Sequence, residues 1–331
     1  MDQFKKSLLV LFGFGLSFCQ AQTSSLSQEL QFVTAIELPN VSGRIDHLSY
    51  DSNHQIVYVA ALGNNTVEVV DLKTGKVVHT IRNLDEPQGI FFIPKSSFIV
   101  ANGGNGACDV FDAGTYQKII TIKLSGDADN VRYDSTGERI YIGYGNGAIA
   151  VIDAKSWKIV ADIKLTGHPE SFQLDKTRQK IYVNVPHQKQ IEIIDLGTQS
   201  VTGRWEITDA SSNFPMSLDE IGHRLFIGCR QPTKLLIIDT LSGKTISSVD
   251  IDADVDDVFY NVFNKQIYAS CGGGYVDVIK QVEPNKYENR LKLETSSGAR
   301  TSILIPELNQ FIVAAPSRSG RKAQLMIYRI K

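Results

Sequence analysis

Side chains able to move protons and hold anions cluster near the start of this 331-residue sequence and recur near its end. Arg44, Asp46 and His47 lie within four residues, and Arg300 stands in a similar polar segment. An imidazole titrates near neutral pH and a neighbouring carboxylate can tune it. An arginine can hold a substrate carboxylate through two parallel hydrogen bonds. If the chain is an enzyme, these four are the predicted catalytic residues.

Other polar residues stand ahead of β-rich runs elsewhere in the chain. Amides, acids, imidazole and guanidinium in one place suit recognition of a small polar molecule, and crowded carboxylates raise one another's pKa. The residues predicted to bind a ligand are Gln88, Asp129, Asn130, His168, Glu170, Asn213, Arg230, Asp256 and Asp257.

Metal binding and named reactions have less support. Asp46, Asp129 and Asp256, with His47 nearby, could supply oxygen and nitrogen ligands for a divalent cation. However, they come from distant segments without a local ligand spacing, so no metal-ligating residue is predicted. No Gly-x-Ser-x-Gly or His-Glu-x-x-His motif indicates a reaction. The sequence names no cofactor.

A repeated strand pattern must position these residues. Its copies follow one another at steps of 41, 42, 41, 44, 42 and 44 residues. Each unit has four short runs rich in Val, Ile, Tyr and Phe, separated by turn residues. Four strands per repeat, without a sustained helical period, predict an all-β, seven-bladed β-propeller. The central residues of the repeats, hereafter the repeat column, are Tyr58, Ile99, Tyr141, Tyr182, Phe226, Tyr268 and Ile312.

The two ends of the chain should close the ring. The seventh unit has room for only three strands before Lys331, whereas residues 30–38 form a strand without a partner. Placing this N-terminal strand in the last blade would cover exposed sheet edges. We therefore predict one domain over residues 22–331, with four antiparallel strands in every blade.

The repeats resemble those of the bacterial YVTN-repeat β-propellers. Residues 181–184 read Ile-Tyr-Val-Asn, and the turns at 71–76 and 239–244 follow a shared Asp-to-Gly-Lys pattern. The resemblance covers nearly the whole chain after residue 21. It implies an exported seven-bladed propeller but no particular activity, because propellers host many functions.

Loops of such a fold lie on two faces. One face should carry the repetitive turns that begin at aspartates, whose carboxylates can accept backbone N–H bonds. We expect these residues to be structural: Asp71, Asp112, Asp153, Asp195 and Asp239. The loops on the other face differ from blade to blade. They hold the candidate catalytic and ligand-binding residues at the mouth of the central channel.

The N-terminal residues indicate export. Lys5 and Lys6 precede an apolar run over 8–18, and small residues follow, as in a signal peptide over 1–21. Cleavage after Ala21 is expected, with lipidation of Cys19 as the alternative. The protein should be periplasmic or secreted, without a transmembrane segment in its mature chain. The three remaining cysteines cannot all pair, and we expect them to be buried.

The charge balance narrows the class of partner. The net charge is −2 and no basic stripe is present, so nucleic acid is not expected. We predict a monomeric scaffold that binds a small polar molecule, a glycan or a protein at the mouth, with no defined reaction. The alternative is a lyase or lactonase that acts on a sugar acid or lactone at the same mouth.

Overall fold

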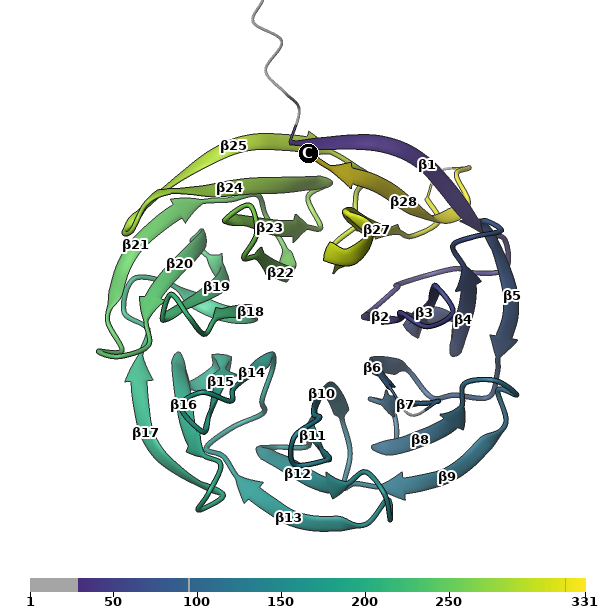
Figure 1. Ribbon diagram of the computed structural model, residues 1–331, viewed down its shortest axis with the longest axis horizontal. Helices are drawn as coiled ribbons and strands as arrows, with labels where there is room; N and C mark the ends of the chain where they lie inside the picture. The colour runs from purple at the N-terminus through teal and green to yellow at the C-terminus, as the bar shows by residue number, and fades with distance from the viewer. Residues whose placement is uncertain (1–28, 95, 319) are drawn as a thin grey trace, which may run out of the picture.

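The computed structural model describes residues 29–331, apart from Lys95 and Ser319. Seven four-stranded antiparallel sheets stand around a central channel like the blades of a propeller (Figure 1). Chain order runs around the ring, and within each of the first six blades it runs from the channel outward. The predicted seven-bladed, all-β fold is therefore confirmed.

The first three blades contain the strands up to Lys164. Blade 1 comprises β2 (Leu48–Asp51), β3 (Ile56–Ala61), β4 (Thr66–Asp71) and β5 (Lys76–Ile81). Blade 2 comprises β6 (Pro87–Ile93), β7 (Ser97–Asn102), β8 (Ala107–Asp112) and β9 (Lys118–Lys123). Blade 3 comprises β10 (Ala128–Asp134), β11 (Arg139–Tyr144), β12 (Ala148–Asp153) and β13 (Ile159–Lys164).

The remaining blades complete the ring. Blade 4 comprises β14 (Phe172–Asp175), β15 (Lys180–Val185), β16 (Gln190–Asp195) and β17 (Ser200–Glu206). Blade 5 comprises β18 (Ser211–Asp219), β19 (Arg224–Gln231), β20 (Thr233–Asp239) and β21 (Thr245–Asp250). Blade 6 comprises β22 (Val255–Asn261), β23 (Gln266–Cys271), β24 (Tyr275–Glu283) and β25 (Lys286–Glu294). Blade 7 comprises β26 (Thr301–Ile305), β27 (Gln310–Ala315), β28 (Ala323–Ile330) and β1 (Leu30–Leu38).

The second strand of each blade forms the centre of the core. Every residue of β3 is buried, because both faces of its sheet pack against neighbouring blades. The repeat column is buried throughout. Two of its rings stack across blade boundaries, Tyr58 on Phe98 and Tyr268 on Phe311, with ring centres 4.2 and 5.0 Å apart. Cys108, Cys229 and Cys271 are buried and unpaired, as expected.

Helical structure is almost absent from the described chain. It consists of three short 3₁₀ turns, η1 (Leu62–Asn64), η2 (Pro186–Gln188) and η3 (Pro306–Leu308). No helix among the described residues has the length and apolar character needed to cross a membrane.

The N-terminal strand closes the ring as predicted. β1 pairs antiparallel with β28, from Leu30 opposite Ile330 to Leu38 opposite Ala323. The backbone N–H of Lys331 donates to the carbonyl of Glu29 at 3.2 Å. The two ends of the described chain consequently lie side by side at the rim (Figure 1). The predicted signal peptide lies outside the described residues.

The repetitive turns have the structural role expected for them. In the turn after β8, the backbone N–H groups of Gly114 and Thr115 donate to Asp112 Oδ1 at 3.0 and 2.7 Å. These bonds from Thr115, and then from Gly114, hold the pKa of Asp112 below its ordinary value. The turns at Asp71, Asp153, Asp195 and Asp239 repeat the arrangement.

Removing buried volume from the closing strand should weaken the fold. Ile36 in β1 is buried among residues of blades 7 and 1, whereas Val33 in the same strand is 45% exposed. We expect Ile36→Ala to lower the free energy of unfolding by about 2–5 kcal/mol. Val33→Ala should change it by no more than about 0.5 kcal/mol. Denaturant titrations of both variants provide the measurement, and equal effects would contradict this account of closure.

Candidate functional site

Each blade contributes one side chain to the channel mouth. In every innermost strand, one residue pairs with the repeat column, as Ser49 pairs with Tyr58. Counting back three residues from that position leads to the entrance of the blade, either at the start of the innermost strand or in the loop just before it. The seven residues found in this way all line one cavity, and we call them the mouth ring: Asp46, Gln88, Asp129, Glu170, Phe214, Asp256 and Arg300.

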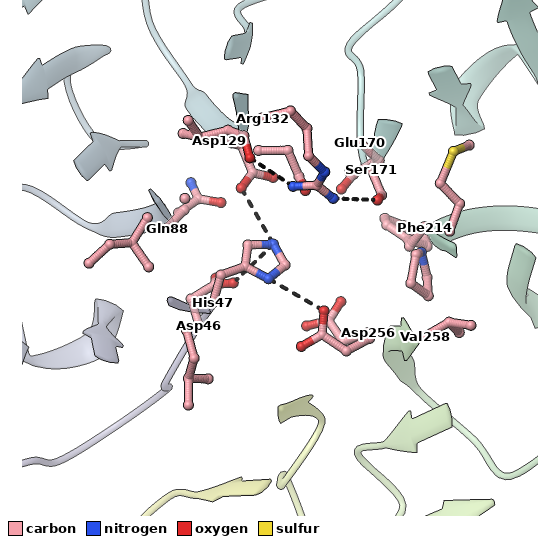
Figure 2. Close-up of a pocket in the computed structure, with 18 of the residues that line it drawn as sticks. Asp46, His47, Gln88, Asp129, Arg132, Glu170, Ser171, Phe214, Asp256 and Val258 are labelled. Carbon is pink, nitrogen blue, oxygen red and sulfur yellow. Dashed lines mark hydrogen bonds and ion pairs between the residues drawn. The ribbon is translucent and has the colours of Figure 1, made fainter. Parts of the chain in front are cut away.

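The cavity runs from the mouth ring into the channel and has a volume of about 950 Å³. That volume suits a small-molecule ligand. The deeper wall mixes polar and aromatic side chains from the innermost strands, including Arg132, Gln173, Phe91 and Phe259. Figure 2 shows side chains from different blades pointing into this common space.

His47 lies centrally among three carboxylates. Its Nδ1 is 3.5 Å from Asp257 Oδ1, and its Nε2 is 3.8 Å from Asp46 Oδ1 and 3.9 Å from Asp129 Oδ1. Figure 2 shows Asp129 on one side of the ring and the Asp256 segment on the other. Burial opposes the charged imidazolium, but the hydrogen bond and charge of Asp257 and the charges of the other two acids outweigh it. Together they raise the pKa of His47 to about 10.

This pKa changes the role expected of His47. A side chain that stays protonated at neutral pH cannot accept a proton from a substrate there. His47 instead supplies a fixed positive charge that holds Asp46, Asp129 and Asp257 together. The geometry therefore gives no support to the predicted use of His47 as a general base.

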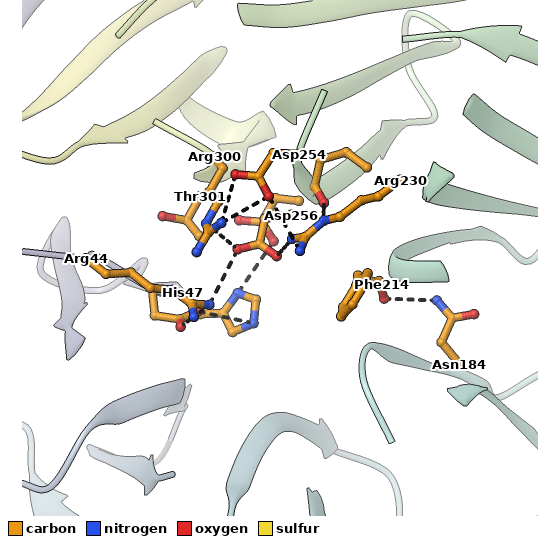
Figure 3. Close-up of polar contacts among 12 residues, drawn as sticks. Arg44, His47, Asn184, Phe214, Arg230, Asp254, Asp256, Arg300 and Thr301 are labelled. Atoms are coloured by element: carbon orange, nitrogen blue, oxygen red, sulfur yellow. Dashed lines mark hydrogen bonds and ion pairs between the residues drawn. The ribbon is translucent and has the colours of Figure 1, made fainter. Parts of the chain in front are cut away.

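Three arginines gather around Asp256, next to His47 (Figure 3). Arg300 donates from Nη1 to Asp254 Oδ2 at 2.8 Å, and its Nε lies 3.0 Å from Asp256 Oδ2. Arg230 pairs with the same two acids, while Arg44 lies 3.6 Å from Asp256 Oδ2 and 2.8 Å from Asp46 (Figure 3). We call Arg44, Arg230 and Arg300 the arginine cluster. Each of its guanidinium groups forms ion pairs with the buried or half-buried carboxylates of Asp46, Asp254 or Asp256.

Two acids at the mouth lack such partners. Among the described residues, no arginine or lysine forms an ion pair with Asp129 or Glu170. Burial is the main cause that raises the pKa of each to about 7, and nearby negative charges add to it. For Asp129 the added charges are those of Asp46 and Glu170, partly offset by His47. For Glu170 the largest is that of Asp256, which Arg230 partly offsets.

A buried arginine was missed by sequence reasoning. Arg132 donates from Nη1 to the carbonyl of Val131 at 2.9 Å and from Nη2 to Ser171 Oγ at 3.3 Å. Its guanidinium stacks over the ring of Phe172, and burial lowers its pKa. Arg132 lies inside β10 rather than in a varied loop. The available signal was its place opposite Tyr141 of the repeat column, which directs it toward the channel.

The structure brings together all but one of the predicted site residues. Asn213 does not line the cavity, because its buried side chain faces blade 4, donating to Asn184 Oδ1 at 2.9 Å and to the carbonyl of Gln190 at 3.2 Å. Its neighbour Phe214 reaches the mouth instead and stacks on Arg230. The predicted residues that line the cavity are Arg44, Asp46, His47, Gln88, Asp129, Asn130, His168, Glu170, Arg230, Asp256, Asp257 and Arg300.

Two of the peripheral residues are held by neighbours. His168 Nδ1 lies 2.6 Å from the carbonyl of Gly145, and Gln88 Nε2 donates to Asp127 Oδ1 at 3.4 Å. Over the described part of the chain, no three His, Cys, Asp or Glu side chains gather in an arrangement that could hold a metal ion.

Together, the fold and the mouth define a seven-bladed β-propeller with a polar central cavity. Comparison with models of known families and with curated proteins finds no match. Among solved structures, hydrazine synthase of Kuenenia stuttgartiensis is similar over 89% of this chain and 96% of its own, with a TM-score of 0.74 and 15% identity. A chain of a mitotic checkpoint complex is similar over 98% of this chain and 99% of its own, with a TM-score of 0.76 and 13% identity. Such low identities show the shared fold alone.

The charge on His47 should make stability depend on pH. Its folded-state pKa of about 10 exceeds the ordinary value of 6.5, so its stabilising contribution is complete below about pH 6.5 and is lost as pH rises through about 10. We expect the stability difference between wild type and His47→Gln to shrink by roughly 4 kcal/mol over that interval. Denaturant titrations at both ends of the interval test this, and a constant difference would contradict the assigned charge.

Proposed function

We propose that this chain is an exported β-propeller that binds a small polar ligand at the mouth of its channel. The observation that carries the proposal is the mouth ring, in which each of the seven blades contributes one side chain to one cavity of about 950 Å³. Five residue types occupy these seven positions, namely Asp, Glu, Gln, Phe and Arg. Ring closure requires similar strands in every blade, but it does not require this variety at the entrances of the blades. Polar groups that converge on a concave site are typical of ligand binding.

Buried atoms without partners also support binding. Asp129 Oδ1 and Asn130 Oδ1 are buried in the cavity wall and accept no hydrogen bond. A buried polar atom left without a partner is costly, so such atoms are commonly satisfied by a ligand or by water. A bound polar molecule would supply the missing donors.

A lyase or lactonase acting on a sugar acid or lactone at the same mouth is the second candidate. The observation that favours it is the pair Asp129 and Glu170, since a carboxyl with a pKa of about 7 can give or accept a proton at neutral pH. His47 would then act by its charge, and Arg132 or the arginine cluster would hold the substrate carboxylate.

The wider setting is also part of the proposal. The Ile-Tyr-Val-Asn strand and the Asp-to-Gly-Lys turns support membership of the YVTN-repeat propellers, and residues 1–21 support export to the periplasm or beyond the cell. The protein would act as a monomer. A glycan or a protein segment that presents a polar group is an alternative occupant of the same mouth.

A ligand screen with mouth variants tests the proposal. We expect thermal melts to identify stabilising compounds among sugars, sugar acids, amines and amino acids. Binding of such a compound should weaken at least about tenfold in Asp129→Leu or Arg300→Met. Asp112→Asn, on the opposite face, is the matched control and should bind normally. A compound that binds equally well to both mouth variants would place its site elsewhere.

The same screen separates binding from catalysis. Incubating each stabilising compound with the protein and following it by mass spectrometry should leave the compound unchanged if the mouth only binds. Conversion that disappears in Glu170→Gln would instead favour the lyase or lactonase.

A further inference from the structure

We infer that the ligand carries a protonated amine, which the carboxylates of Asp129 and Glu170 hold at the mouth. This inference rests on the proposed function and specifies the chemical class of the ligand. It follows from the hydrogen-bonding needs of the cavity wall and from the distribution of charge around it.

The wall lacks hydrogen-bond donors rather than acceptors. Among the described residues that line the cavity, each buried side-chain atom without a hydrogen bond is an oxygen: Asp46 Oδ2, Asp129 Oδ1, Asn130 Oδ1 and Asp256 Oδ2. The oxygens of Asp46 and Asp256 lie 2.8 and 3.0 Å from nitrogens of Arg44 and Arg300. Those of Asp129 and Asn130 have no arginine beside them, although the two residues are only 6% and 3% exposed. The only cation that forms an ion pair with Asp129 Oδ1 among the described residues is His47, whose Nε2 is 3.9 Å away and beyond hydrogen-bond distance. A ligand that presents donors to this side of the mouth would satisfy both oxygens.

The charge around the cavity is unevenly balanced. On one side, the arginine cluster faces Asp46, Asp254 and Asp256, three positive charges against three negative charges. The remaining acids are Asp127, Asp129, Glu170 and Asp257. Among the described residues, none of these four forms an ion pair with an arginine or lysine. His47 and Arg132 lie among them, and the charges of Arg44 and Arg230 act on the Asp129–Glu170 pair from the arginine cluster. With every carboxyl ionised, this second side has an excess of two negative charges. A cation gains most from entering there.

When no ligand is bound, protonation of the carboxyl groups can neutralise this excess negative charge. Burial of Asp129 and Glu170, together with the charges of neighbouring acids, raises the pKa of each to about 7, so each carries a proton for part of the time at neutral pH. An ammonium group that enters between them would favour their ionised forms and release protons. Amine binding should therefore strengthen as pH rises through about 7, while binding of an anion should weaken.

Other titratable groups around the pair must be considered in the same pH range. Those whose charges act on Asp129 or Glu170 are Arg44, Asp46, His47, Asp127, Arg132, His168, Arg230 and Asp256. Asp256, whose pKa is raised to about 6, also titrates close to this range. Its carboxylate forms ion pairs with the arginine cluster, whereas Asp129 and Glu170 form none with an arginine or lysine among the described residues. Variants of Asp129 and Glu170 are thus needed to assign the pH dependence.

The test uses probes that share a skeleton and differ in charge. Glucosamine, glucose and glucuronate form one set, and propylamine, propanol and propionate form another. Isothermal titration calorimetry of the full mature chain should give the amine of at least one set an affinity about tenfold or more above its neutral and acidic counterparts. Titrations in buffers of different protonation enthalpy should also detect proton release with that amine.

Charge-neutral variants provide the second arm. Asp129→Asn and Glu170→Gln should each lower amine affinity about ten- to hundredfold, because each removes a charged acceptor. Both should also reduce proton release. Asp112→Asn should do neither. Thermal melts should show that all three variants remain folded. At Asp129 and Glu170 the amide avoids the cost of desolvating a carboxylate, and at Asp112 the amide oxygen keeps an acceptor for the N–H groups of the turn.

Outcomes separate this inference from the proposed function. Preference for glucuronate, propionate or the neutral probes would overturn the amine while leaving a polar-ligand site in place. Failure of both amines to bind would also overturn it, and the wider ligand screen would then decide the proposed function independently. Amine binding unaffected by either carboxyl variant would place the amine elsewhere and overturn the assignment.

Discussion

The structure depends on burial of both faces of every blade. A four-stranded sheet with one uncovered apolar face would expose the repeat column, so each blade needs a neighbour on either side, and the row must close on itself. β1 meets this requirement by pairing with β28. Closure also brings seven innermost strands to one axis, which places the beginning of each strand at a common mouth. The stability of the ring and the existence of the cavity therefore have the same cause.

This origin explains why the site combines such different side chains. Packing constrains the repeat column, whose members are all large and apolar, and hydrogen bonding constrains the turns that begin at Asp112 and its equivalents. Neither constraint reaches the mouth ring, whose side chains line the cavity and contact one another instead of packing between blades. Acids, an amide, an aromatic ring and a guanidinium can therefore occupy equivalent positions without disturbing the fold.

The features that the sequence predicted correctly are mostly those constrained by packing or by turn hydrogen bonds. The repeats, the closing strand and the structural turns could be predicted because each depends on local pattern. Most mouth residues could be predicted because their loops vary while the strands repeat. Arg132 was missed because it lies deeper in its strand than the blade entrances, opposite the repeat column. Asn213 was misplaced because a bulged innermost strand turns its side chain toward the neighbouring blade. The raised pKa of His47 depends on acids distant in the sequence, such as Asp257, which only the fold brings beside it. No local sequence pattern predicts that contact.

The mouth also breaks the symmetry of the ring that forms it. Around the channel, the arginine cluster, His47 and the Asp129–Glu170 pair are three different contacts, and the deeper wall with Arg132 lies beneath them. Three unlike contacts above a wall of defined shape have a handedness, even though the backbone beneath repeats seven times. A chiral guest and its mirror image could not satisfy all of them equally. A guest that touched all three contacts would therefore be bound in one hand in preference to the other.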